Sequence, residues 1–165
     1  MLSKLPQLSR IPYVEFEVYP SINKMENLNP FWTSGFVTGE GSFTYFTKTR
    51  INSVGKTIKD YYLVFEVSQK TKDLHILNLI NAYFKIGNIY TDTKGMSRYR
   101  LRVQNQRINT LIPHFNNYPL VGYKALQYLV WIKIVNILNN QVRTDLRDIE
   151  IEKLIKELSN LKWKN

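Results

Sequence analysis

The first candidate for chemistry in this sequence is a single acidic side chain between two glycines. Glu40 lies between Gly39 and Gly41, at the end of a segment that is otherwise apolar or small. Carboxylates bind hard divalent cations such as Mg²⁺, which fills its other positions with water and substrate oxygens. The sequence has no cysteine and only two histidines, His75 and His114. Disulfides and Cys-based zinc sites are therefore excluded. Two histidines also give little support to a His-rich metal centre or a Ser-His-Asp triad.

The segment that precedes Glu40 predicts a helix with an unusual face. Asn29 can cap its start, and Pro30 suits the first helical position because its missing N–H would have no partner there. Gly35 and Gly39 are four residues apart and so share one face. Each glycine costs a helix roughly 0.5–1 kcal/mol relative to alanine. We therefore expect another backbone to come very close to this face.

Residues 33–43, Thr-Ser-Gly-Phe-Val-Thr-Gly-Glu-Gly-Ser-Phe, resemble the LAGLIDADG motif of homing endonucleases and intron maturases. The acidic metal ligand of the family falls on Glu40, whereas its sixth position, often Asp, is Thr38 here. The resemblance implies a divalent metal, usually Mg²⁺, held by Glu40 from two copies of the motif. It also implies that the two copies pack through the motif helix, as a homodimer or with a partner subunit. The expected interface residues are Ser34, Gly35, Thr38 and Gly39. Without the motif, Glu40 would be read as a surface carboxylate in a turn.

Two later stretches match the same family. Residues 65–71, Phe-Glu-Val-Ser-Gln-Lys-Thr, look like its second strand and the exit from it, where Gln69 would orient the attacking water. Residues 118–124, Tyr-Pro-Leu-Val-Gly-Tyr-Lys, look like the entry to its long helix, where Lys124 would stabilise developing negative charge. The alternatives are a polar residue at a strand end for Gln69 and a solvated lysine for Lys124.

Hydrophobic periodicity predicts the elements that must position these residues. The expected strands cover residues 42–50, 59–69, 88–93 and 96–105. The expected helices cover residues 29–40, 73–87, 108–115, 122–140 and 145–163. This α-β-β-α-β-β-α order, with extra C-terminal helices, is that of one LAGLIDADG unit, so we predict an α+β fold with a curved antiparallel four-stranded sheet. The expected buried residues of the last two helices are Leu126, Leu129, Val130, Ile134, Ile137 and Leu138, then Leu146, Ile149, Leu154, Ile155, Leu158 and Leu161.

One face of the predicted sheet carries cations and aromatic rings. The side chains expected there are Ser42, Thr44, Phe46, Lys48, Arg50, Tyr62, Glu66, Arg98, Arg100 and Arg102, with Lys94 at a hairpin tip. A curved sheet fits the major groove of duplex DNA, where arginine can bind guanine through two hydrogen bonds. Other cations would neutralise phosphates. The alternative is that the arginines lie on a merely solvated face.

Composition limits the classes of function. The net charge of +10, from 23 basic and 13 acidic residues, favours a nucleic-acid partner or an anionic membrane. No apolar run is long enough to span a bilayer, so we expect no membrane role.

Residues 1–28 are broken by three prolines and predict an irregular, linker-like arm, followed by one domain over 29–165. Frequent Ile, Asn, Lys and Tyr indicate an A/T-rich genome, and we expect a mitochondrial location.

Three functions fit these observations. The first is a site-specific endonuclease that cuts duplex DNA as a homodimer. The second is a non-catalytic protein on the same fold that binds structured RNA, such as an intron maturase or a ribonucleoprotein component. The third is one half of a two-motif enzyme, which needs a different partner subunit.

Overall fold

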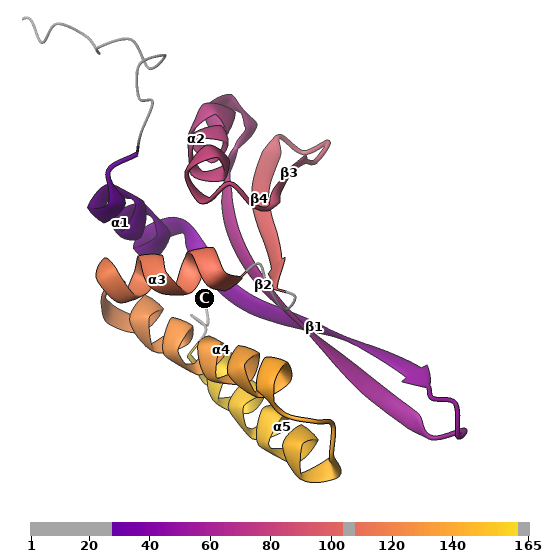
Figure 1. Ribbon diagram of the computed structural model, residues 1–165. Coiled ribbons are helices and arrows are strands. Elements are labelled where there is room, and N and C mark those ends of the chain that lie inside the picture. Colours follow the sequence, from indigo (N-terminus) through magenta and orange to yellow (C-terminus); the bar gives the residue numbers. More distant parts are fainter. Residues whose placement is uncertain (1–27, 104–107, 162–165) are drawn as a thin grey trace, which may run out of the picture.

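The computed structural model describes residues 28–103 and 108–161, and its element order is the predicted one (Figure 1). The elements are α1 (Pro30–Glu40), β1 (Gly41–Ile51), β2 (Thr57–Lys70), η2 (Thr71–Asp73), α2 (Leu74–Phe84), β3 (Asn88–Thr91), β4 (Met96–Val103), α3 (Ile108–Asn117), α4 (Gly122–Asn140) and α5 (Asp145–Asn160). The α+β class is confirmed. The predictions for residues 1–27, for Asn105 and for Trp163 concern positions outside the described residues.

The four strands form one antiparallel sheet in the order β1-β2-β4-β3. Strand β1 pairs with β2 along its whole length, from Gly41 opposite Val67 to Ile51 opposite Thr57. Strand β4 reaches only as far as Leu63 of β2. The outer part of the β1–β2 hairpin is therefore two strands wide and projects past the other two strands (Figure 1).

One face of the sheet is covered by helices and forms the core. Phe43, Phe65 and Leu101 from three neighbouring strands are all buried, as the alternation in the sequence predicts. Phe65 contacts the rings of Phe43 and Phe84, and Phe43 contacts Trp131 of α4. Aromatic contacts between sheet and helices therefore fix how the helical layer lies over the strands.

The predicted buried stripes of α4 and α5 are wrong at four positions. Leu126 and Leu129 of α4 are exposed, and so are Leu146 and Ile149 of α5. Helix α4 packs against β1, α1 and α5, so its buried residues face several neighbours. They are Gln127, Tyr128, Val130, Trp131, Ile134, Val135 and Ile137. Apolar spacing alone did not show which side of α4 each neighbour covers.

Helix α2 ends earlier than its expected glycine. Its last residue is Phe84, and Lys85 after it takes the left-handed conformation at φ 56°. Gly87 has a φ of 97°, and a Cβ there would lie 2.7 Å from the ring of Tyr99. Gly87 is therefore needed for the close approach of the chain to β4. In the part of the chain that the structure describes, no helix has the length and apolarity needed to cross a bilayer.

Candidate metal and nucleic-acid site

Glu40 is the last residue of α1 and its side chain is exposed. The helix starts as predicted, with Asn29 Oδ1 accepting the backbone N–H groups of Phe31 at 2.9 Å and Trp32 at 3.3 Å. Within residues 28–103 and 108–161, no hydrogen bond or ion pair involves the Glu40 carboxylate. An exposed carboxylate at a fixed backbone position is thus available to a ligand from outside this unit.

Gly41 connects α1 to β1 without any intervening loop. It is buried, and a Cβ there would lie 2.6 Å from both Cγ1 and the carbonyl oxygen of Val37. Only a residue without a side chain lets the strand leave the helix in such close contact with it. The position of Glu40 relative to the end of the sheet is therefore set by backbone packing.

Lys124, in the first turn of α4, lies next to this junction. Its ammonium group donates to the carbonyl oxygen of Gly41, and its side chain is partly buried. Burial lowers the pKa of Lys124, while the negative charge of Glu40 acts in the opposite direction. The structure therefore brings Glu40 and Lys124 together although 83 residues separate Lys124 from Gly41. A fully solvated Lys124, the alternative reading, does not match this geometry.

Gln69 lies at the same end of the sheet. It is the second-last residue of β2, two positions beyond Val67, which pairs with Gly41. Because side chains alternate along a strand, Gln69 is on the same side as Val67 and Phe65, the side that the helices cover. It is partly buried. The end of α1, the strand register and the Lys124–Gly41 hydrogen bond thus place the three predicted catalytic residues near the junction of α1 with the sheet.

The two glycines of α1 form an open face. Gly35 and Gly39 are both exposed, and a Cβ added at either would meet no other atom within 4 Å. Thr38 is partly buried, and its hydroxyl donates to the Ser34 carbonyl oxygen at 2.8 Å. The backbone that we expected close to these glycines is therefore not found among the described residues of this chain. The face remains available for a second unit.

Ser34 has a different role from the one expected at an interface. It is buried, and its hydroxyl donates to the Tyr118 carbonyl oxygen at 2.6 Å. The same hydroxyl lies 3.0 Å from Nε2 of His114, whose Nδ1 lies 3.0 Å from the Tyr83 hydroxyl. Burial lowers the pKa of His114 to about 4. Ser34 therefore anchors α1 to α3 through a neutral histidine and points into its own core.

The predicted cationic face exists, and two groups of contacting side chains form on it. Around Glu66, Arg100 is 2.6 Å and Arg98 is 3.7 Å from the carboxylate oxygens, and Arg98 also pairs with Asp92 at 2.9 Å. Around Tyr62, the ring of Phe46 stacks with centroids 4.8 Å apart. Arg102 and Lys48 lie near these rings. Phe46 is thus only partly exposed, because Tyr62 and Arg102 cover it.

The outer part of the β1–β2 hairpin is connected to the helical layer by charges. Arg143, between α4 and α5, lies 2.7 Å from Asp60 and 3.1 Å from Asp148. Burial raises the pKa of Asp60, but hydrogen bonds from Arg50 and Arg143 outweigh it and hold that pKa below its usual value. Arg143 is not among the predicted site residues, because nothing in its local sequence indicates a partner 83 residues away.

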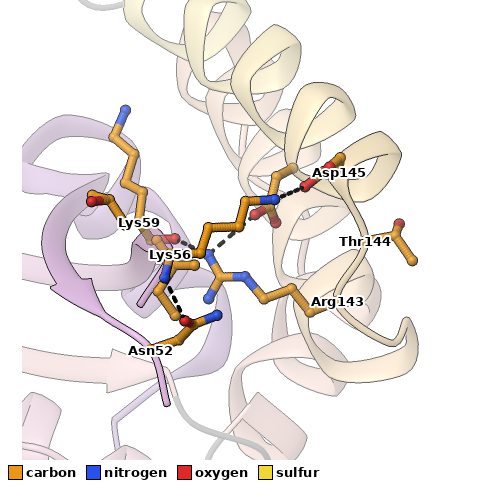
Figure 2. Close-up of a pocket in the computed structure, with 9 residues that line it drawn as sticks. Asn52, Lys56, Lys59, Arg143, Thr144 and Asp145 are labelled. Atoms are coloured by element: carbon orange, nitrogen blue, oxygen red, sulfur yellow. Dashed lines mark hydrogen bonds and ion pairs between the residues drawn. The ribbon is translucent and has the colours of Figure 1, made fainter. Parts of the chain in front are cut away.

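A pocket of about 370 Å³ lies between this hairpin and the start of α5 (Figure 2). Lys56 crosses it to Asp145 at 3.0 Å, and Lys59 pairs with Glu152 at 2.6 Å. Figure 2 shows the Arg143 side chain reaching from the α4–α5 connection toward the hairpin. Most charged side chains around the pocket are thus already in ion pairs. These pairs hold the outer part of the β1–β2 hairpin in position, and the pocket is a poor candidate for a binding site.

A family model described as LAGLIDADG endonuclease matches residues 33–135, which run from α1 into α4. The chain belongs to the LAGLIDADG endonuclease family. Among curated relatives it is 34% identical over 116 residues to "Probable intron-encoded endonuclease 3" of Neurospora crassa, covering 69% of this chain and 21% of the relative. It is 25% identical over 142 residues to "Uncharacterized 50.9 kDa protein in ND4 intron 1" of Podospora anserina, covering 84% of this chain and 31% of that relative. This LAGLIDADG chain therefore spans about a third or less of the length of these relatives.

Solved structures place the same fold beside DNA. The meganuclease I-SmaMI, solved bound to uncleaveable DNA, is 29% identical with a TM-score of 0.73, over 83% of this chain and 46% of that chain. The homing endonuclease I-TnaI has a TM-score of 0.68 at 20% identity, over 82% of this chain and 96% of that chain. The second likeness concerns the fold alone. Together they confirm the predicted LAGLIDADG architecture.

The LAGLIDADG site of this chain offers one carboxylate to a metal. Among residues 28–103 and 108–161, no group of three or more His, Cys, Asp or Glu side chains could hold an ion. Mg²⁺ is commonly held by one or two carboxylates, with substrate phosphates and water completing its coordination. Glu40 is exposed and makes no hydrogen bond or ion pair with the described residues, so it could supply one carboxylate to such a site.

Proposed function

We propose that this chain is one unit of a site-specific endonuclease that cleaves both strands of duplex DNA. The observation that carries the proposal is Glu40, an exposed carboxylate at the helix–sheet junction that makes no hydrogen bond or ion pair with the described residues and whose charge acts on Lys124. The names of the intron-encoded endonucleases and the DNA complex of I-SmaMI support the same reaction. Several relatives are named as intron-encoded proteins, among them the ND4 intron protein of Podospora anserina and the endonuclease aI3 of Kluyveromyces lactis. On the basis of these names we extend the proposal to a mitochondrial location.

The active site would form between two units. Helix α1 of each would pack through Gly35 and Gly39, where the lack of side chains permits close backbone contact. Two Glu40 carboxylates would then approach each other, and their repulsion would be relieved by a shared divalent cation, usually Mg²⁺. When bound, this metal would activate a water molecule and neutralise phosphate charge. The second unit is another copy of this chain or a different LAGLIDADG partner.

The residues around Glu40 would assist the hydrolysis. The Lys124 ammonium, held by the Gly41 carbonyl oxygen, would stabilise negative charge that develops on the scissile phosphate. Gln69, at the end of β2, would orient the attacking water. Both groups are partly buried, so their orientation is already constrained before DNA binds. We assign Glu40 to the metal, Lys124 to the phosphate and Gln69 to the water.

The open face of the sheet would bind the DNA. The proposed contact residues are Ser42, Thr44, Phe46, Lys48, Arg50, Tyr62, Glu66, Lys94, Arg98, Arg100 and Arg102. Strands β1, β2 and β4 present most of them on the side opposite the buried core. A basic curved sheet can enter the major groove, and its phosphate contacts would make the affinity depend strongly on salt.

Cleavage of a selected duplex tests the proposal. Binding duplexes would be selected from a random-sequence DNA library and then incubated with the protein and Mg²⁺. We expect both strands to be cut, and Glu40→Gln to bind the same duplex but abolish cutting. Glu150→Gln, the same change at an exposed residue of α5, is the matched control and should leave cutting intact.

Two results would overturn the proposal. Equal cutting by Glu40→Gln would remove the assigned metal ligand. Tight binding of structured RNA, with no selection of any duplex, would favour the RNA-binding alternative. Light scattering of the protein on its duplex distinguishes the two kinds of assembly, since a homodimer has twice the 19.5 kDa mass of the chain.

A further inference from the structure

The three arginines of β4 have different partners. Arg100 and Arg98 both approach the carboxylate of Glu66, at 2.6 Å and 3.7 Å, so part of their charge is already neutralised. Arg102 approaches two aromatic rings instead. Its guanidinium carbon lies 5.0 Å from the ring centroid of Phe46 and 5.4 Å from that of Tyr62. No ion pair involves Arg102 in the described parts of the chain.

The two rings form a fixed support for this guanidinium. Phe46 and Tyr62 are direct partners in the β1–β2 register, and their rings stack at 4.8 Å with an angle of 10° between planes. Both are partly buried. Beside them, Val64 pairs with Arg102 across β2 and β4 and is only 4% exposed, so it closes the surface at the base of the Arg102 side chain. The guanidinium thus lies over a largely apolar surface, with which its N–H groups make no hydrogen bond.

Stacking and base recognition by arginine do not compete. A guanidinium stacks through its planar face, whereas its five N–H donors lie in the plane and remain available. For Arg98 and Arg100, binding a base would first break contacts with Glu66. The directed donors of Arg102 make no hydrogen bond or ion pair with residues 28–103 and 108–161, and its side-chain entropy is already reduced, so a base contact costs less.

We propose that Arg102 is the main specificity-determining residue of the open face and that it binds one guanine through O6 and N7 in the major groove. Phe46 and Tyr62 act as positioning residues that hold the guanidinium in place. This inference rests on the proposed DNA-binding function of the same face. It predicts that the DNA contacted by each copy of this chain contains one G·C pair, in a fixed orientation, whose recognition depends on Arg102.

The test measures binding to the selected duplex and to every single-base variant of it. Each correct bidentate contact contributes about 1–3 kcal/mol of discrimination, which is roughly 5- to 150-fold in affinity. We expect Arg102→Ala to lose this preference at one G·C pair and to keep the others. Arg102→Lys keeps the charge but not the paired donors, so it should lose the same preference while retaining the salt dependence of wild type.

Phe46→Leu tests the positioning role. It keeps an apolar residue on β1 but removes the ring, so discrimination at the same G·C pair should fall partway. Its salt dependence should stay unchanged because no charge is removed. Arg100→Ala is the comparison, an exposed arginine two residues away that we also place on the DNA. It should weaken binding to every duplex variant but leave that G·C preference intact.

The inference fails if Arg102→Ala weakens all duplex variants equally, or if Arg100→Ala removes the same preference as Arg102→Ala. Either result could occur while the wild-type protein still selects and cuts its duplex, so it would leave the proposed function standing. If wild type instead selects no duplex at all, the proposed function fails and the inference fails with it. Arg102 is exposed, so its variants should fold, and circular dichroism would verify this.

Discussion

The two ends of the β1–β2 hairpin are held by different forces. The inner end, at Gly41, lies in the four-stranded part of the sheet, where residues such as Phe65 are fully buried under the helices. The outer end, at Ile51 and Thr57, is two strands wide and is connected to the helical layer through Arg143 and its carboxylate partners. Packing dominates at one end and charge at the other.

This difference matches the work that each end would do. Catalysis requires its groups at fixed positions, and the packed inner end holds Glu40 and Lys124 beside Gly41. Binding to DNA tolerates small movements, which an end held by partly exposed ion pairs permits. Buried packing is insensitive to salt, whereas exposed ion pairs contribute about 0–1 kcal/mol and weaken as salt rises. Three perturbations should separate the two ends.

The largest expected effect is a loss of stability in mild acid, caused by His114 near the inner end. Its pKa is about 4 in the folded protein and 6.5 when solvated. Well above pH 6.5 the ring is neutral in both states, and stability is full. As the pH falls from 6.5 toward 4, the unfolded chain takes up a proton that the folded chain does not, so the free energy of unfolding falls. Linkage gives a loss of about 2 kcal/mol between pH 7 and pH 5.

Urea denaturation at pH 7, 6 and 5 would measure this loss. His114→Gln can keep hydrogen bonds to Ser34 and Tyr83 without titrating, so its stability should change much less over this range. His75→Gln, at an exposed position, is the control and should behave like wild type. A wild-type stability that stays constant from pH 7 to pH 5 would contradict this account of the inner end.

The second perturbation compares two glycines on either side of Glu40. Gly41→Ala places a methyl group 2.6 Å from the backbone and side chain of Val37, and such overpacking costs about 1–3 kcal/mol. Gly39→Ala meets no atom within 4 Å and should stabilise the single unit by up to about 1 kcal/mol, because alanine favours the helix.

Urea denaturation at low protein concentration would compare the two variants, and light scattering with duplex DNA would follow assembly. Gly39→Ala should weaken assembly, since the added methyl group separates the two α1 helices on the proposed interface. If both variants lose equal stability as single units, the assignment of Gly41 to internal packing and Gly39 to an outer contact is wrong.

Sequence patterns predicted features that lie within one element and missed contacts between residues far apart in the chain. Alternation placed Phe65 in the core, and the spacing of Gly35 and Gly39 put both glycines on one helix face, because both signals lie within one element. The backbone expected close to that face is not found among the described residues. The bonds from Arg143 to Asp60 and from Ser34 to His114 join residues about 80 positions apart, and only the folded chain shows them. The resemblance to the LAGLIDADG family, by contrast, predicted that Lys124 lies near Glu40, although no local pattern indicates this.

The smallest expected effect comes from the charges at the outer end. Arg143→Ala leaves Asp60 and Asp148 without this partner and should cost about 1 kcal/mol at low salt, and less at 1 M salt because screening weakens the lost attraction. Lys56→Ala is the control, since both members of the Lys56–Asp145 pair are more than half exposed, at 60% and 85%, and no measurable loss is expected. Urea denaturation at two salt concentrations would measure both. A loss at Arg143 that does not depend on salt would mean that packing of its side chain, and not its charge, holds the outer end, and the contrast between the two ends of the hairpin would disappear.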